Sequence, residues 1–193
     1  MKYLMIFHAN LNYAYLTPDR YEFVIRNSYE LILDTMRQQF PQVKFVFEAS
    51  GYTLDEIAGR CPDVLAKLND AIARGQCEFM GSPYAHPMLP NFPKEDGLWS
   101  IRFSNDTYRK HLGAVPRSFW NPECGWRSYV PEQVAEAGYA NLIGDFEAYS
   151  RSCGPDGKPL SAEQFTGYFL EALHGSGMPS FRRKYRDLDL LVI

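Results

Sequence analysis

The chain has 193 residues, of which 46% are hydrophobic and 22% charged, and its formal net charge at pH 7 is −3. This composition is typical of a globular protein with a substantial core, and we expect one domain over residues 1–193. The longest basic run is Arg182-Arg183-Lys184, which excludes the electrostatic footprint of a nucleic-acid-binding protein, and no segment approaches the roughly 20 apolar residues that span a bilayer.

The cysteines and the N-terminus indicate a cytoplasmic protein. The apolar run at the N-terminus ends at His8 without a cleavage signature, so we interpret it as a first strand instead of a signal peptide. The cysteines form no C-x-x-C pair and predict free thiols in a reducing compartment: Cys61, Cys77, Cys124 and Cys153.

Short apolar runs alternate with stretches of helical periodicity along the chain. Helices are predicted at 21–40, from 53, from 62 to a stop at Gly75, at 94–112 before Gly113, at 130–137 and at 162–173. A turn-rich surface loop is expected at 150–160. Strands are predicted at 3–7, 43–47, 77–80, 115–120 (shifted toward Arg117 by Pro116), 141–143 and 188–193.

This alternation predicts an α/β fold with parallel strands joined by right-handed crossovers. A complete (β/α)8 barrel needs about 250 residues. We therefore expect an incomplete parallel (β/α) barrel, or a fragment of a longer protein.

Reactive groups in parallel α/β folds gather where the carboxyl ends of the strands meet the following loops. Five such loops carry histidines, carboxylates and aromatic residues. In chain order, these loops contain His8, Glu48–Tyr52, residues 81–90 with His86, Trp120–Trp126, and Asp145.

The segment Phe119-Trp120-Asn121-Pro122-Glu123-Cys124-Gly125-Trp126-Arg127 places one carboxylate between two tryptophans. Partial burial shifts the pKa of a carboxyl group, and indole faces suit the apolar face of a sugar. Glu123 therefore fits a glutamate that attacks or donates a proton. The alternative is a loop glutamate beside two core tryptophans.

Three ordered motifs resemble those of glycoside hydrolase family 57. They are Gly75-Gln76-Cys77-Glu78-Phe79 leading into Pro83-Tyr84-Ala85-His86-Pro87, then Pro93-Lys94-Glu95-Asp96, then Trp120-Asn121-Pro122-Glu123-Cys124-Gly125-Trp126. The family's first motif is a histidine followed by Gln-Pro. Here it is His8-Ala9-Asn10, so only the histidine carries over.

The resemblance implies an incomplete barrel of the (β/α)7 type and a retaining hydrolase or transglycosylase acting on α-1,4-linked glucans or malto-oligosaccharides, without a cofactor or metal. It maps the nucleophile onto Glu123 and implies that substrate is contacted by His8, His86, Trp120, Trp126 and Asp145. A retaining enzyme also needs an acid/base carboxyl group about 5–5.5 Å from the nucleophile. The family pattern places that aspartate just after Ile193, and it does not assign hydrolysis, transfer or branching, or an oligomeric state.

Each candidate also has a structural interpretation. His8 would hydrogen-bond a neighbouring loop, His86 would cap a proline-rich loop and Asp145 would cap a helix, while we interpret Glu48 as the polar end of a strand.

Two other functions remain open. One is a glucan-binding barrel remnant without catalysis. The other is a metal-dependent polysaccharide deacetylase. The second is disfavoured because such sites use closely spaced histidines, whereas the pair nearest in sequence, His86 and His111, is 25 residues apart.

Overall fold

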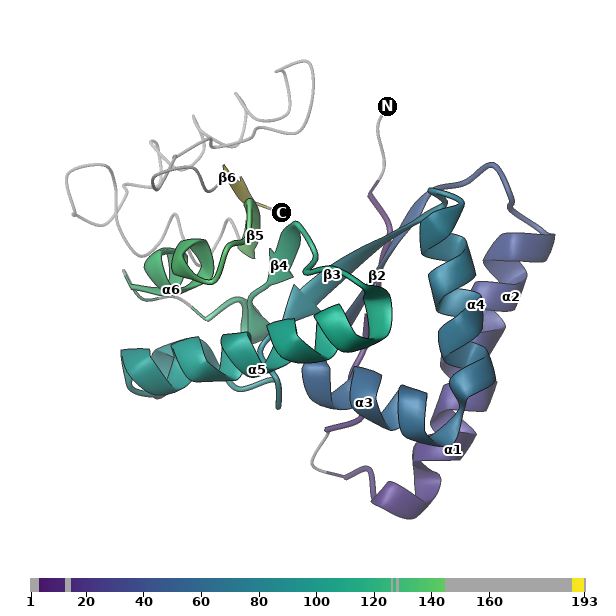
Figure 1. Cartoon of the computed structure of the whole chain (residues 1–193), viewed down its shortest axis with the longest axis horizontal. Helices are drawn as coiled ribbons and strands as arrows, with labels where there is room; N and C mark the ends of the chain where they lie inside the picture. Colours follow the sequence, from purple (N-terminus) through teal and green to yellow (C-terminus); the bar gives the residue numbers. More distant parts are fainter. Residues whose placement is uncertain (1–3, 13–14, 126, 128, 145–188, 193) are drawn as a thin grey trace, which may run out of the picture.

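The computed structural model describes residues 4–12, 15–125, 127, 129–144 and 189–192 (Figure 1). The strands are β1 (Ile6–Ala9), β2 (Phe45–Ser50), β3 (Cys77–Ser82), β4 (Ser118–Trp120), β5 (Asn141–Gly144) and β6 (Asp189–Val192). The helices are α1 (Tyr21–Val24), α2 (Leu31–Gln38), α3 (Gly51–Arg60), α4 (Pro62–Ala73), α5 (Lys94–Leu112) and α6 (Val130–Glu136).

The six strands form one sheet in the order β1-β2-β3-β4-β5-β6, and every neighbouring pair is parallel. A doubly wound fold would reverse its strand order at a switch point. Here the order in the sheet follows the order in the chain, as in a (β/α) barrel. The prediction of an α/β fold built as an incomplete parallel barrel is confirmed.

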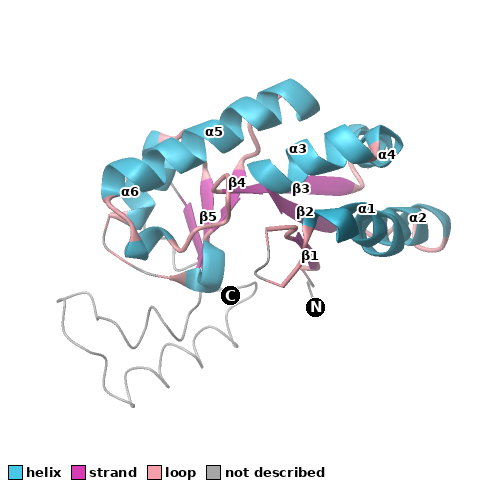
Figure 2. Ribbon diagram, turned by 90° about the horizontal axis from the view of Figure 1, so that it is seen from below, coloured by secondary structure: helices cyan, strands magenta, loops and turns pink. Residues whose placement is uncertain are grey.

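The helices cover one face of the sheet (Figure 2). Alternate strand residues point to opposite faces. On the outer face, Phe47 and Phe79 pack in a core with residues of the helices. On the inner face, Val46 and Met80 pack with Ile143, and no helix residue belongs to this smaller cluster among the described residues.

Most predicted elements lie close to the observed ones. The prediction for residues 94–112 matches α5, which ends at Gly113 in the left-handed conformation (φ 80°) that favours glycine. The first strand is displaced: it was predicted at 3–7 and is observed at Ile6–Ala9, so His8 lies within β1 instead of following it. The second strand also continues to Ser50, so Glu48 lies inside β2.

The helix predicted at 21–40 is divided by a wide π-helical turn at Ile25–Glu30. Phe23 contributes to the apolar pattern of this segment in the sequence but is exposed. The buried residues instead recur every four positions, at Tyr21, Ile25, Tyr29 and Leu33. An ideal α-helix has 3.6 residues per turn, so residues four positions apart drift around its surface. The wider π-helical turn contains more residues and keeps this four-residue spacing on one face.

Other predictions lie partly or wholly outside the described residues. The predicted surface loop at 150–160 and the helix at 162–173 fall there entirely. Cys61 and Cys77 are free thiols as predicted, whereas Cys153 is not among the described residues. No helix in the described ranges combines the length and apolar character that crossing a membrane requires.

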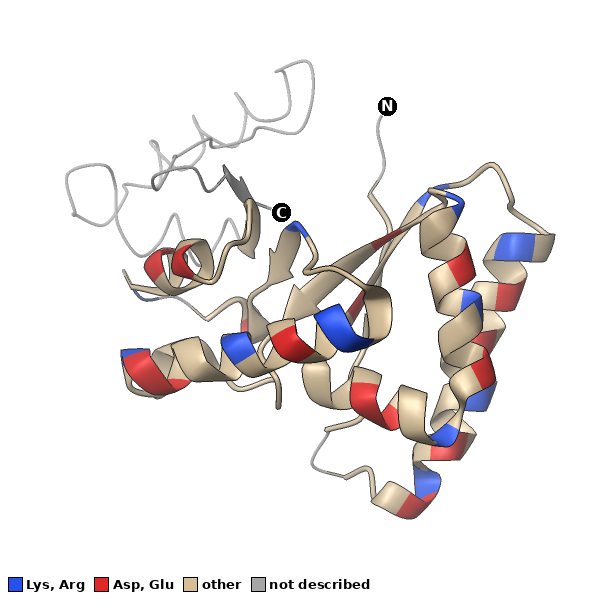
Figure 3. Ribbon diagram, viewed as in Figure 1, with Lys and Arg blue, Asp and Glu red and all other residues tan. Residues whose placement is uncertain are grey.

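Charged residues of both signs are distributed along the helices (Figure 3).

Asp55 on α3 forms a cluster with α5, where its carboxylate accepts hydrogen bonds from His111 Nε2 (2.8 Å) and the Thr107 hydroxyl (3.1 Å). The Tyr84 hydroxyl donates a third (3.2 Å), and Lys110 Nζ lies 3.7 Å from the carboxylate. His111 is therefore largely packed against α3, with its side chain 13% exposed.

We expect Asp55→Asn to lower the free energy of unfolding at pH 7 by about 1–3 kcal/mol, because the variant loses hydrogen bonds to a charged acceptor. Burial raises the pKa of Asp55, but the hydrogen bonds from His111, Thr107 and Tyr84 outweigh it and lower the pKa below its ordinary value of 3.8. A depressed folded-state pKa stabilises the protein above the unfolded pKa, and this stabilisation is lost as pH falls through the folded pKa.

Urea unfolding of the wild type and of Asp55→Asn tests this prediction. It is measured at pH 7 and in the acid range below the ordinary aspartate pKa. The difference in stability should shrink at the lower pH. The matched control is Asp106→Asn on the exposed side of α5, which breaks only an exposed pair with Arg109 and should change stability by less than about 1 kcal/mol. A difference for Asp55→Asn that is constant with pH would contradict this prediction.

Candidate active site

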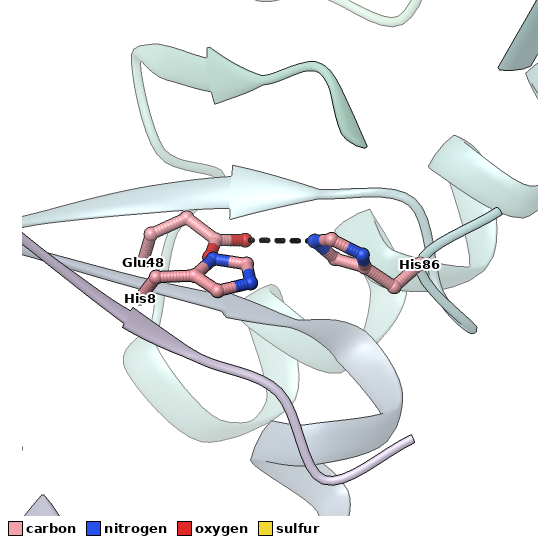
Figure 4. A group of neighbouring side chains, drawn as sticks. All are labelled: His8, Glu48 and His86. Atoms are coloured by element: carbon pink, nitrogen blue, oxygen red, sulfur yellow. Dashed lines mark hydrogen bonds and ion pairs between the residues drawn. The ribbon is translucent and has the colours of Figure 1, made fainter. Parts of the chain in front are cut away.

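Three side chains from different parts of the chain meet at the carboxyl ends of the first three strands: His8, Glu48 and His86 (Figure 4). The backbone register pairs His8 of β1 with Glu48 of β2, so both side chains point to the inner face. His8 Nδ1 hydrogen-bonds Glu48 Oε2. His86 arrives from the loop after β3, with its ring centroid 4.9 Å from that of His8 and its Nε2 4.0 Å from Glu48 Oε1.

Glu48 is the buried centre of this cluster. Its side chain is 0% exposed, and burial raises its pKa while the hydrogen bond from His8 opposes that shift. The same hydrogen bond raises the pKa of His8, against the effect of burial. The hydrogen bond therefore favours the charged form of each partner. The interpretation of Glu48 as only the polar end of a strand was wrong.

His86 is held as a neutral imidazole. Its side chain is 6% exposed, and burial together with the charge of His8 lowers its pKa to about 4. Its backbone is left-handed (φ 54°), and its N–H donates to Pro83 O (3.0 Å) in the preceding turn. The loop is tied to the one after β1, because Asn12 Nδ2 donates to Ala85 O (2.8 Å).

Trp120 and Glu123 approach the cluster from β4. Trp120 ends the strand with its ring centroid 5.9 Å from that of His8. Glu123 is exposed in the turn Pro122–Cys124 directly after β4, and its charge contributes to raising the pKa of His8. The turn is fixed by Asn121, whose side-chain amide donates to Gly125 O.

The turn that carries Glu123 is packed against the loop that carries His86. A Cβ atom on Gly125 would lie 2.8 Å from Pro90 Cγ, so the close approach of the two loops requires glycine there. Glu123 has φ 54° and Cys124 φ 49°, both in the left-handed region. With His86, these are the non-glycine residues with positive φ in the described ranges. Such strain costs about 1–3 kcal/mol per residue and clusters at functional sites.

The structure thus brings together four of the predicted site residues: His8, His86, Trp120 and Glu123. Trp126 and Asp145 lie outside the described residues. Glu48 was missed as a site residue. The sequence carries one signal for it, a single acidic residue inside the apolar run Phe45-Val46-Phe47-Glu48-Ala49. A carboxylate buried with such a strand requires a hydrogen-bonding or charged partner.

A cavity of about 490 Å³ lies elsewhere, at the amino ends of β2 and β3. Its lining includes Phe45 and Cys77 together with Leu112 and Val115 near the end of α5, and it contains no histidine. In parallel barrels the amino-terminal edge serves stability and the carboxyl-terminal edge carries chemistry. We therefore assign the candidate site to the cluster around Glu48 and not to this cavity.

Comparison with known proteins identifies the family. The sequence matches the profile described as glycosyl hydrolase family 57 over residues 2–186. The chain belongs to glycosyl hydrolase family 57. This match includes every strand and loop that contributes to the candidate site.

Two named relatives are similar over most of the chain. Alpha-amylase 1 of Dictyoglomus thermophilum is 27% identical over 164 residues, which is 83% of this chain and 23% of that protein. The 4-alpha-glucanotransferase of Thermococcus litoralis is 30% identical over 152 residues, 78% of this chain and 22% of that protein. The chain thus spans less than a quarter of the length of these relatives.

The fold agrees as well. The crystal structure of the 4-alpha-glucanotransferase from Thermococcus litoralis superposes with a TM-score of 0.67 and 29% sequence identity, over 84% of this chain and 25% of that one. The incomplete barrel described here therefore shares the fold of that 4-alpha-glucanotransferase over the residues compared.

Proposed function

We propose that this chain is part of the catalytic barrel of a retaining hydrolase or transglycosylase that acts on α-glucans, and that Glu123 is its nucleophile. The relatives named alpha-amylase and 4-alpha-glucanotransferase support the substrate class. The observation that carries the proposal is the conformation of Glu123. It is a solvent-exposed carboxylate in a strained left-handed turn at the carboxyl end of β4.

In this proposal the Glu123 carboxylate attacks the anomeric carbon and forms a glycosyl-enzyme ester, which water or a second sugar hydroxyl then cleaves. Trp120 offers an indole face to the apolar face of the sugar. His8, whose side chain is 42% exposed, can donate a hydrogen bond to a sugar hydroxyl.

The second carboxyl group of the mechanism is not Glu48. Both oxygens of Glu48 are enclosed, one bonded to His8 and the other facing His86. A buried and paired carboxyl group cannot protonate a departing sugar oxygen. Asp145 lies outside the described residues.

The proposal is tested by trapping the glycosyl-enzyme ester. The chain is incubated with 5-fluoro-α-glucosyl fluoride, whose leaving group needs little acid assistance, and is then digested for mass spectrometry. We expect a fluoroglucosyl adduct on the peptide that contains Glu123, at Glu123 itself. Glu123→Gln should remain unlabelled, whereas Glu136→Gln, on the exposed side of α6, should label like the wild type. An adduct on another carboxylate, or none on correctly folded protein, would refute the role of Glu123.

A further inference from the structure

Two buried polar atoms in the cluster face each other without a hydrogen-bond partner: Glu48 Oε1 and His86 Nε2. They are 4.0 Å apart, too far for a direct hydrogen bond, and their side chains are 0% and 6% exposed. An unpaired buried polar group costs about 1–3 kcal/mol, so two of them aimed at one point indicate a group that binds between them.

The donor set identifies the chemistry of that group. His8, Glu48 and His86 each offer one ligand atom, and the three atoms lie within 4.8 Å of one another. Two imidazoles with one carboxylate suit a borderline transition-metal dication, whereas Mg²⁺ and Ca²⁺ prefer oxygen ligands alone.

The spacing requires only a small contraction. Ligands at about 2.0–2.1 Å from a tetrahedral Zn²⁺ are about 3.4 Å apart. The three atoms, which lie within 4.8 Å of one another, would therefore approach by at most roughly 1.4 Å. The histidines are 78 positions apart in the chain. The strand order brings this distant pair together, whereas spacing along the sequence reveals only near neighbours.

We infer that His8, Glu48 and His86 form a binding site for a transition-metal dication, with Zn²⁺ as the best match. Three protein ligands leave a fourth position open. His8 is the exposed member of the set, and Trp120 lies beside it with ring centroids 5.9 Å apart. The inference does not depend on the proposed role of Glu123.

The test is direct metal binding by the full chain after treatment with a chelator. Zn²⁺ is titrated by calorimetry, and Co²⁺ is titrated by its visible absorption. We expect one equivalent of each, with a dissociation constant for Zn²⁺ on the order of 1 μM or tighter. The Co²⁺ spectrum should show nitrogen and oxygen ligands without a thiolate charge-transfer band.

His86→Gln and His8→Gln should each weaken Zn²⁺ binding on the order of a hundredfold or more. The matched control is His111→Gln, which removes a histidine outside the cluster and should bind Zn²⁺ like the wild type. Circular dichroism establishes that each variant is folded. The inference is overturned if the wild-type chain binds no stoichiometric Zn²⁺ or Co²⁺, if His86→Gln binds as tightly as the wild type, or if a thiolate band assigns the ion to cysteine.

Discussion

Glu123→Gln is expected to lower kcat/KM for α-glucosyl fluoride on the order of a thousandfold or more. An amide has nearly the shape of the carboxylate, but it cannot form the glycosyl ester by nucleophilic attack. Glutamine can also adopt the left-handed backbone of this turn at a cost similar to that of glutamate. The change should therefore remove the chemistry while leaving the fold intact, and initial rates of fluoride release measure it.

Two further variants sharpen this result. Glu123→Asp withdraws the carboxylate by one methylene, about 1.5 Å, and misplacement on this scale costs about a hundredfold. Glu136→Gln, on the exposed side of α6 in a pair with Arg102, should keep wild-type activity. If Glu123→Gln retained more than a tenth of the wild-type rate, Glu123 would not be the nucleophile. Retained affinity for malto-oligosaccharides without activity in the wild type would instead favour the glucan-binding remnant.

The fold followed from local signals in the sequence that are independent of tertiary packing. The periodicity of residues 94–112 and the stop at Gly113 predicted α5 with its observed bounds, Lys94–Leu112. The first two strands were predicted too close to the N-terminus, because the observed strands continue into polar residues. His8 and Glu48 were interpreted as the ends of strands, whereas their side chains face each other within the sheet. Strand ends depend on pairing with the neighbouring strand, which a single sequence does not show.

The site was predictable only in part for the same reason. Glu123 and Trp120 stand in one short motif, so their proximity was evident. The convergence of His8 and His86 depends on β1 and β3 flanking β2 in the sheet. Glu48 gains its importance from the register with His8, and only coordinates give that register.

Tyr108 of α5 joins the two strand ends that carry the candidate site. Its side chain is fully buried, and its hydroxyl lies 2.7 Å from Ala49 O and 3.0 Å from Ser82 O. The hydroxyl also accepts the N–H of Ser82 at 3.0 Å. Ala49 follows Glu48 in β2, and Ser82 ends β3 just before the loop that contains His86. One hydroxyl thus satisfies backbone groups at the ends of both strands.

Tyr108→Phe is therefore expected to lower the free energy of unfolding by about 2–4 kcal/mol, since it leaves a buried N–H and a buried C=O unpaired at a cost of about 1–3 kcal/mol each. The ring is retained, so its edge contact with Phe79 at 5.3 Å persists and no cavity forms. Urea unfolding at pH 7 measures the change. The control is Tyr52→Phe, whose half-buried hydroxyl makes one long hydrogen bond of 3.4 Å to Tyr21 and should contribute less than about 1 kcal/mol. Equal losses in the two variants would show that the Tyr108 hydroxyl does not anchor the strand ends. A loss confined to Tyr108→Phe would identify α5 as the element that holds β2 and β3 in register beneath the site.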